Sequence, residues 1–159
     1  MSYPEPRYLG ETGEVSARFR RMDQAPELPM RAGSASYLAT GASTHGMFGL
    51  YRWDMAGPRS GPDPHFHRTM SESFFILSGT VRLYDGQDWI DATPGDFCYV
   101  PEGGIHAFKN ESGEPASMLI LFAPGAPREG YFEGLAAGIG DLSDEERADF
   151  FLRHDNHWL

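Results

Sequence analysis

Apolar and aromatic residues alternate with polar residues over short stretches in the middle of the chain. Alternation of this kind is typical of half-buried strands, because successive side chains of a strand point to opposite faces. Glycine, proline, asparagine and aspartate separate the stretches, as expected for turns. We predict strands at 34–40, 46–55, 65–67, 73–77, 80–84, 88–92, 96–100, 106–109 and 116–122. Many short strands joined by turns favour an all-β barrel or sandwich.

The two ends of the chain follow different patterns. Residues 1–33 are polar and rich in proline, glycine and arginine, which predicts an arm with one or two short extended pieces. A short helix is expected at 130–139, and Ser143 with Glu146 predicts a capping box that starts a second helix ending near Arg153. We therefore divide the chain into an N-terminal arm (1–33), a barrel (34–123) and a helical extension (124–159) that packs on the same domain.

Composition and charge exclude several classes of protein. The length of 159 residues suits one domain, and the net charge of −10 without a basic run disfavours nucleic acid and anionic membrane surfaces as partners. No apolar run approaches the roughly 20 residues that cross a bilayer, and the N-terminus lacks the apolar stretch of a signal peptide. Cys98 is the single cysteine, so we expect a small core residue and no intrachain disulfide. These features predict a cytoplasmic protein.

Histidines and one glutamate carry the candidate chemistry. His65 and His67 are two residues apart, so an extended backbone directs both side chains to one face. Glu72 can return on a neighbouring strand, and His106 begins a strand after the turn that contains Gly103. Three imidazoles and one carboxylate suit iron, nickel, copper, zinc or manganese and leave coordination positions free for a substrate. We predict one divalent transition metal ion here; the alternative is a metal-free pocket lined by these polar groups.

The two segments resemble the paired motifs of the cupin superfamily. The first segment has the form H-x-H-x4-E-x6-G, and the second has the form G-x5-P-x-G-x2-H-x3-N. Fifteen residues separate them, as in small microbial cupins. All nine defining residues are present: His65, His67, Glu72, Gly79, Gly95, Pro101, Gly103, His106 and Asn110. One departure is Arg59, which stands where the superfamily has a glycine.

The resemblance implies a jelly-roll β-barrel and the metal ligands His65, His67, Glu72 and His106. The chain is similar to single-domain bacterial cupins of the quercetin-dioxygenase type. That similarity implies a metal-dependent dioxygenase that acts with O2 on a phenolic or enolic small molecule. Glu72 would be both a ligand and a catalytic base. The superfamily also contains metal-dependent isomerases and cyclases, and cupins that bind small molecules without turnover.

Several further residues can be assigned from the strand pattern. Phe74 and Ile76 share the parity of Glu72, and Phe108 shares that of His106, so we expect an apolar, substrate-binding wall or ordinary barrel filling from these three. His45 is expected in a surface turn, and His154 and His157 in a solvated C-terminal tail. Barrel edge strands need covering, so a homodimer is expected, with the arm or the helices contributing to the interface.

Overall fold

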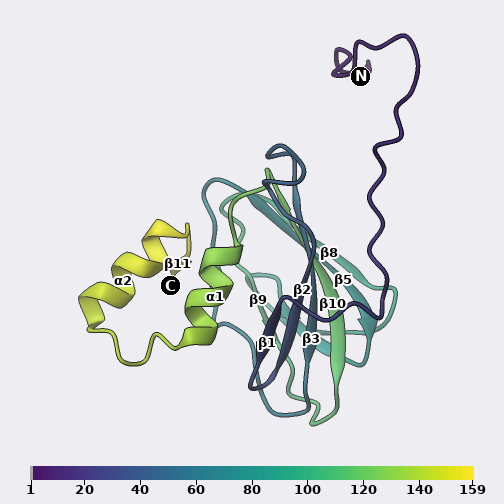
Figure 1. Ribbon diagram of the computed structural model, residues 1–159. Coiled ribbons are helices and arrows are strands. Elements are labelled where there is room, and N and C mark those ends of the chain that lie inside the picture. The colour runs from purple at the N-terminus through teal and green to yellow at the C-terminus, as the bar shows by residue number, and fades with distance from the viewer. Residues whose placement is uncertain (1) are drawn as a thin grey trace.

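The computed structural model describes residues 2–159, and its body is built mainly of antiparallel strands (Figure 1). The predicted strands correspond to β2 through β10, with ends that differ by up to three residues. β1 is a short extended piece of the predicted arm, and β11 was not predicted. The strands are β1 (Leu28–Met30), β2 (Gly33–Ala39), β3 (Gly49–Met55), β4 (His65–Phe66), β5 (Ser71–Ser78), β6 (Val81–Tyr84), β7 (Trp89–Ala92), β8 (Phe97–Val100), β9 (Ala107–Lys109), β10 (Ala116–Ala123) and β11 (His157–Trp158).

The strands form two layers. One layer is a six-stranded sheet in the order β1-β2-β3-β10-β5-β8. The other contains the three-stranded sheet β7-β6-β9 and the pair β11-β4, which joins the region of β9 through a bridge between His65 and His106. All the pairs are antiparallel. The arrangement confirms the predicted all-β jelly roll.

The core lies between these layers and follows the alternation of the sequence. In β10, Met118, Ile120 and Phe122 are buried, and their register places Met118 opposite Ile76 and Ile120 opposite Phe74 of β5. Burial of a large apolar side chain stabilises a fold by roughly 1.5–3 kcal/mol. The central strands β10 and β5 therefore form a rigid support for the residues that project from β5 toward the opposite layer.

Two helices follow the barrel, as predicted. These are α1 (Glu129–Ala137) and α2 (Asp144–Arg153). Ser143 accepts from the backbone N–H of Glu146, whose side chain accepts in return from the backbone N–H of Ser143, so the predicted capping box is present. Phe132 of α1 packs with its ring centroid 5.1 Å from those of both Tyr51 and Trp53 in β3. The first helix thus covers one opening of the barrel.

The C-terminal tail contradicts one prediction, because it is not solvated. Its strand β11 pairs with β4, and Asn156 is buried with 1% of its surface exposed. The ring of His157 stacks on Phe66 with centroids 5.1 Å apart, and Nδ1 of His154 donates to the carbonyl oxygen of Phe150. The polar composition of the tail led to the prediction of solvent exposure. The prediction was wrong because the polar groups of the tail form hydrogen bonds inside the fold.

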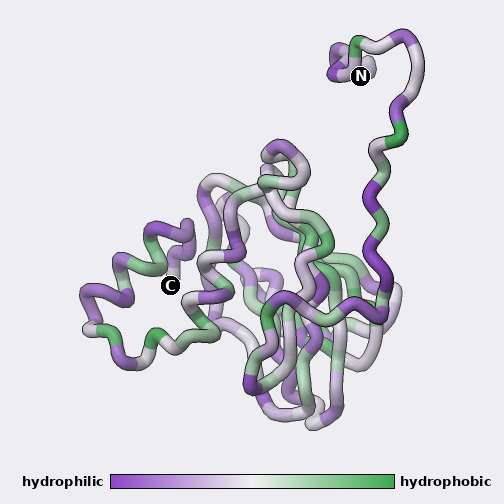
Figure 2. Tube along the Cα trace, in the orientation of Figure 1, coloured by the Kyte–Doolittle hydropathy of each residue, from purple (hydrophilic) through white to green (hydrophobic). Residues whose placement is uncertain are grey.

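The N-terminal segment runs away from the barrel as an extended chain (Figure 1). Isolated hydrophobic positions alternate with polar ones along it (Figure 2), and the side chains of Tyr3, Leu9, Val15 and Phe19 are exposed. The carboxylate of Glu27 ties the base of this segment to the barrel by accepting from the backbone N–H of Tyr37 at 2.8 Å. Within residues 2–159, neither helix has the length and apolar character that crossing a membrane requires.

Candidate metal centre

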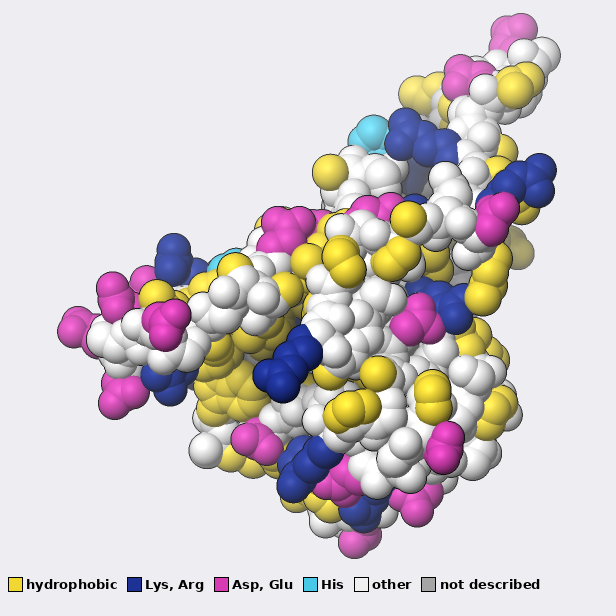
Figure 3. All heavy atoms as spheres, turned by 60° about the horizontal axis from the view of Figure 1, so that its bottom comes forward, with side chains coloured by type: hydrophobic (Ala, Val, Ile, Leu, Met, Phe, Trp, Pro, Cys, Tyr) yellow, Lys and Arg dark blue, Asp and Glu magenta, His cyan; other side chains and the backbone are white. Residues whose placement is uncertain are grey.

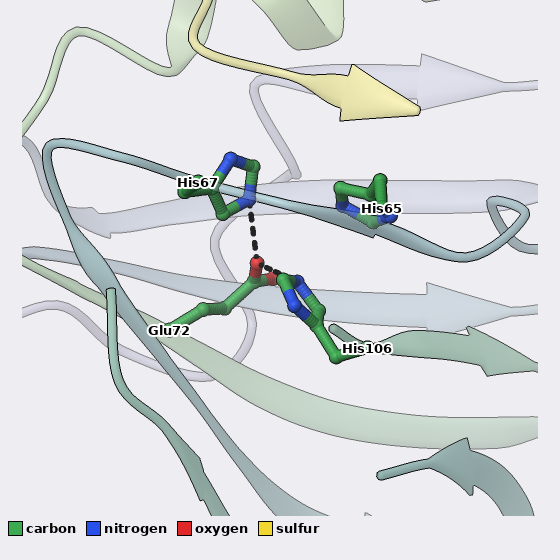
Figure 4. Close-up of side chains that lie close together, drawn as sticks. All are labelled: His65, His67, Glu72 and His106. Atoms are coloured by element: carbon green, nitrogen blue, oxygen red, sulfur yellow. Dashed lines mark hydrogen bonds and ion pairs between the residues drawn. The ribbon is translucent and has the colours of Figure 1, made fainter. Parts of the chain in front are cut away.

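Four side chains from two segments of the chain, residues 65–72 and the position directly before β9, converge inside the barrel (Figure 4). They are the predicted residues His65, His67, Glu72 and His106, and all four are buried. One potential ligand atom from each lies within 4.8 Å of those from the other three. The structure therefore brings together the whole predicted ligand set.

Backbone contacts between the two motifs produce this convergence. The N–H of His65 donates to the carbonyl oxygen of His106 at 3.0 Å, and the N–H of His106 donates back to His65 at 2.9 Å. The carbonyl oxygen of His67 accepts from the N–H of Gly103 at 2.7 Å. Gly103 has φ of +79°, a conformation that glycine adopts without a steric penalty. The Pro-x-Gly turn thus anchors the second motif against the first.

Each imidazole is held by a hydrogen bond on the far side of its ring. The Nδ1 atoms of His65, His67 and His106 lie 2.9, 2.6 and 2.9 Å from the carbonyl oxygens of Asp63, Asp155 and Gly104 respectively. A carbonyl oxygen only accepts, so Nδ1 carries the proton in each ring. The Nε2 atom of a neutral ring then presents a lone pair, which is the form that binds a metal.

The opposite nitrogens crowd around one carboxylate oxygen. Nε2 of His67 and Nε2 of His106 lie 3.0 and 2.8 Å from Oε2 of Glu72. With Nδ1 protonated, the Nε2 atoms of the two neutral rings are hydrogen-bond acceptors, and they face Oε2 of Glu72, which is also an acceptor. Such an arrangement is stable only with additional protons or a cation between the atoms. Three imidazole nitrogens and one carboxylate oxygen are a donor set that fits a divalent transition metal.

The electrostatics of the centre follow from its burial. Burial by itself would raise the pKa of Glu72, but the neighbouring His106 and His67 outweigh it, so that pKa is lowered and the carboxylate stays ionised. Burial, reinforced by His106, lowers the pKa of His65 to about 4. Burial also disfavours the charged form of His106, but Glu72 outweighs this effect and raises its pKa. The centre therefore contains an ionised carboxylate and a neutral His65 at neutral pH.

A cavity of about 310 Å³ adjoins the centre, and His65 and Glu72 reach its wall. Apolar side chains are visible in a hollow between the barrel and the projecting helical extension (Figure 3). Phe108 lines the cavity, and its role in substrate binding stays a prediction. Phe74 and Ile76 do not line it and instead fill the barrel core, which was the alternative for these two residues. Strand parity predicted correctly that Phe74 and Ile76 lie on the same face of β5 as Glu72. It did not predict how far each side chain lies from the cavity, since each step of two residues along β5 moves away from it.

The helical extension contributes cavity residues that sequence reasoning missed. Arg128, Tyr131 and Phe132 come from the start of α1, and Trp158 comes from β11. Helical spacing placed Phe132 on one side of the predicted helix, but no pattern marked these four residues as cavity residues, because that role depends on where the extension folds back. Of the other predicted residues, His45 is exposed with φ of +54°, and Cys98 is half-buried against the core.

Comparison with known proteins agrees with this architecture. Residues 52–122 match the family described as Cupin domain. The chain is 30% identical over 104 residues to an uncharacterized protein of Streptomyces coelicolor, covering 65% of this chain and 93% of that protein. It is 32% identical over 78 residues to quercetin 2,3-dioxygenase of Bacillus subtilis, covering 48% of this chain and 21% of that enzyme. The chain thus spans about a fifth of that enzyme's length.

A solved structure gives the same indication. A sugar phosphate isomerase of the cupin superfamily from Silicibacter pomeroyi superposes with a TM-score of 0.51 at 26% identity, covering 59% of this chain and 60% of that chain. The domain match covers most of the barrel, and the Streptomyces relative is covered over nearly its whole length. This chain is a member of the cupin superfamily.

Proposed function

We propose that this cupin is a metal-dependent dioxygenase that acts with O2 on a small phenolic or enolic compound. The observation that carries the proposal is the set of three imidazoles, each fixed through Nδ1, beside one buried carboxylate at the wall of an apolar cavity. The similarity to the Bacillus quercetin 2,3-dioxygenase supports this reaction class over the other reactions of the superfamily.

His65, His67, Glu72 and His106 would hold the metal. A bound divalent transition metal supplies a Lewis acid with open coordination positions and, for iron, nickel, manganese or copper, a redox centre. The protein's own contribution begins with the three carbonyl oxygens that orient the imidazoles. Such outer contacts commonly change metal affinity or activity by about 10–100-fold when lost.

Glu72 is the residue best situated to accept a proton from the substrate. It is the one carboxylate among the residues that line the cavity, so it is the group there that can receive the proton of a phenolic or enolic hydroxyl. The aromatic rings of Trp53, Phe108 and Phe132 line the same cavity. Flat rings match the faces of a flat substrate and exclude water from a reactive anion.

The test is oxygen consumption by protein loaded with iron, nickel, manganese or copper and supplied with a panel of flavonols that includes quercetin. We expect consumption that depends on both metal and substrate and that is absent from the zinc-loaded protein. Product formation without oxygen would contradict the proposal and favour an isomerase or cyclase. Binding of the panel without any turnover would favour a small-molecule sensor.

We further propose a single domain, with residues 1–33 as arm, 34–123 as barrel and 124–159 as extension, that acts as a homodimer. The outer face of the six-stranded sheet supports a dimer, because Phe75, Phe97 and Tyr99 are exposed on neighbouring strands β5 and β8. Exposed apolar residues grouped in this way mark interaction surfaces. The expected cytoplasmic location and the lack of nucleic-acid partners stay predictions.

A further inference from the structure

Arg128 carries a buried guanidinium directly before α1, with 3% of the residue's surface exposed. Its central carbon lies 4.2 Å from the ring centroid of Tyr131 and 5.0 Å from that of Phe122. Contacts between a cation and aromatic faces offset part of the cost of burial. They do not neutralise the charge, and a buried charge is normally paired with an opposite one.

The hydrogen-bond partners of Arg128 are both neutral. Nη1 donates to the carbonyl oxygen of His154 at 2.6 Å, and Nη2 donates to Oδ1 of Asn156 at 3.0 Å. Nε is buried and has no acceptor. Among residues 2–159, no carboxylate lies within ion-pair distance of this guanidinium. The side chain is therefore held in place without a direct ion pair, since Glu72 and Asp155 act on its charge only at longer range, and its Nε–H has no acceptor.

This unpaired charge lies at the cavity beside the metal centre. Of the side chains that line the cavity, Glu72 is the one carboxylate and Arg128 is the one permanent cation. A divalent ion on Glu72 would leave the cavity with surplus positive charge. The hydroxyl of Ser60 lines the cavity too, and it is buried without a partner. A guanidinium at the cavity wall whose Nε–H has no acceptor is a group that an anionic oxygen would satisfy.

We infer that Arg128 binds a carboxylate of the substrate, so the substrate class is a small carboxylic acid with a flat, apolar body. This inference rests on the proposed function for the identity of the pocket as the substrate site. A carboxylate fits better than a phosphate group, because its single negative charge matches the one permanent cation at the cavity, whereas a phosphate monoester carries close to two charges. The flat body follows from the aromatic walls formed by Trp53 and Phe132.

The experiment measures binding rather than turnover. Trp53 and Trp158 line the cavity, so tryptophan fluorescence of the full-length protein reports on its occupancy. Benzoate, benzamide and phenyl phosphate are titrated into zinc-loaded protein and into protein kept metal-free by a chelator. We expect benzoate to bind at least about tenfold more tightly than benzamide in both states. The reason is that benzoate forms a charged hydrogen bond with the guanidinium, and a bond of this kind contributes enough free energy for a difference of about tenfold in affinity. Phenyl phosphate is expected to bind more weakly than benzoate.

Variants then assign the preference to one side chain. Arg128→Met is expected to abolish the preference for benzoate while changing benzamide affinity only about twofold, and Arg128→Lys is expected to retain part of the preference. The matched control is Arg82→Met, because Arg82 lies on β6 and pairs with Asp91 and Glu111 away from the cavity. A purely structural role for Arg128 would weaken both ligands equally.

Three outcomes would overturn the inference. The first is equal affinity of the wild-type protein for benzoate and benzamide, which needs no variant to fold. The second is a preference that appears only with zinc, since the anion would then be bound by the metal. The third is tighter binding of phenyl phosphate. By contrast, a benzoate preference in a protein that fails to bind zinc would contradict the proposed function and leave the role of Arg128 intact.

Discussion

The carbonyl oxygen of Asp155 accepts a hydrogen bond from Nδ1 of His67 at 2.6 Å. A residue next to the C-terminus thus orients a ring of the candidate metal centre. Asp155 is itself fixed, because its carboxylate accepts from the backbone N–H of Thr69 at 2.8 Å and from the hydroxyl of Thr69 at 2.7 Å. The C-terminal tail is therefore part of the support of the centre, in addition to covering the barrel.

The first prediction concerns this support. Asp155→Ala removes the carboxylate that holds the tail, so His67 loses a fixed partner and zinc affinity is expected to fall about tenfold. Competition with a chromophoric chelator measures the change. Asp149→Ala is the matched control, because Asp149 is exposed on α2 and pairs with Arg153. Equal zinc affinity in the two variants would contradict a role for the tail.

The second prediction concerns the ligand set. His106→Ala removes one of the three nitrogens, and we expect metal affinity to fall by at least about 100-fold and activity to disappear. Elemental analysis of purified protein measures the bound metal. His45→Ala is the control, because His45 is exposed in a turn. Full metal content in His106→Ala would remove this residue from the set.

The third prediction concerns Glu72 as a base. Glu72→Gln keeps the shape of the side chain but cannot accept a proton, so turnover at saturating metal is expected to fall about 10²–10⁴-fold. Substrate affinity, measured by fluorescence titration, is expected to change less than turnover. Unchanged turnover would exclude Glu72 from proton transfer.

The fourth prediction concerns pH. A metal binds the neutral imidazole, and Glu72 raises the pKa of His106 above its ordinary value of 6.5 in the metal-free protein. Protons therefore compete with zinc at His106 as the pH falls from about 8 to about 6, with a loss of up to about tenfold in affinity per pH unit. His65, with its pKa lowered to about 4, adds nothing in this range. Zinc affinity that stays constant across this range would contradict the prediction.

The fifth prediction concerns the dimer. Phe97→Asp places a charge on the exposed apolar face of β8, and we expect light scattering to show a monomer where the unmodified chain is a dimer. Ile90→Asp, at an exposed position of β7 in the other layer, is the control and is expected to remain dimeric. An unmodified chain that is monomeric at micromolar concentration would exclude the proposed dimer.

Short-range patterns in the sequence were sufficient to predict much of the fold. The alternation in β5 and β10 depends on which face of a strand is buried, so it is visible in the sequence before any pairing is known. Ser143 and Glu146 form the expected capping box because its contacts are made within four residues. The two motifs predicted the four converging side chains because turns and spacing determine their placement.

The sequence by itself therefore determined the barrel, its turns, the α2 cap and the membership of His65, His67, Glu72 and His106 in one centre. Only the tertiary structure placed Phe108 at the cavity and Phe74 in the core, since distance along a barrel is not encoded in strand parity. It likewise decided that Arg128 lines the cavity and that Asp155 holds the ring of His67. Those contacts join residues dozens of positions apart along the chain, so they form only when the whole chain is folded and no local pattern marks them.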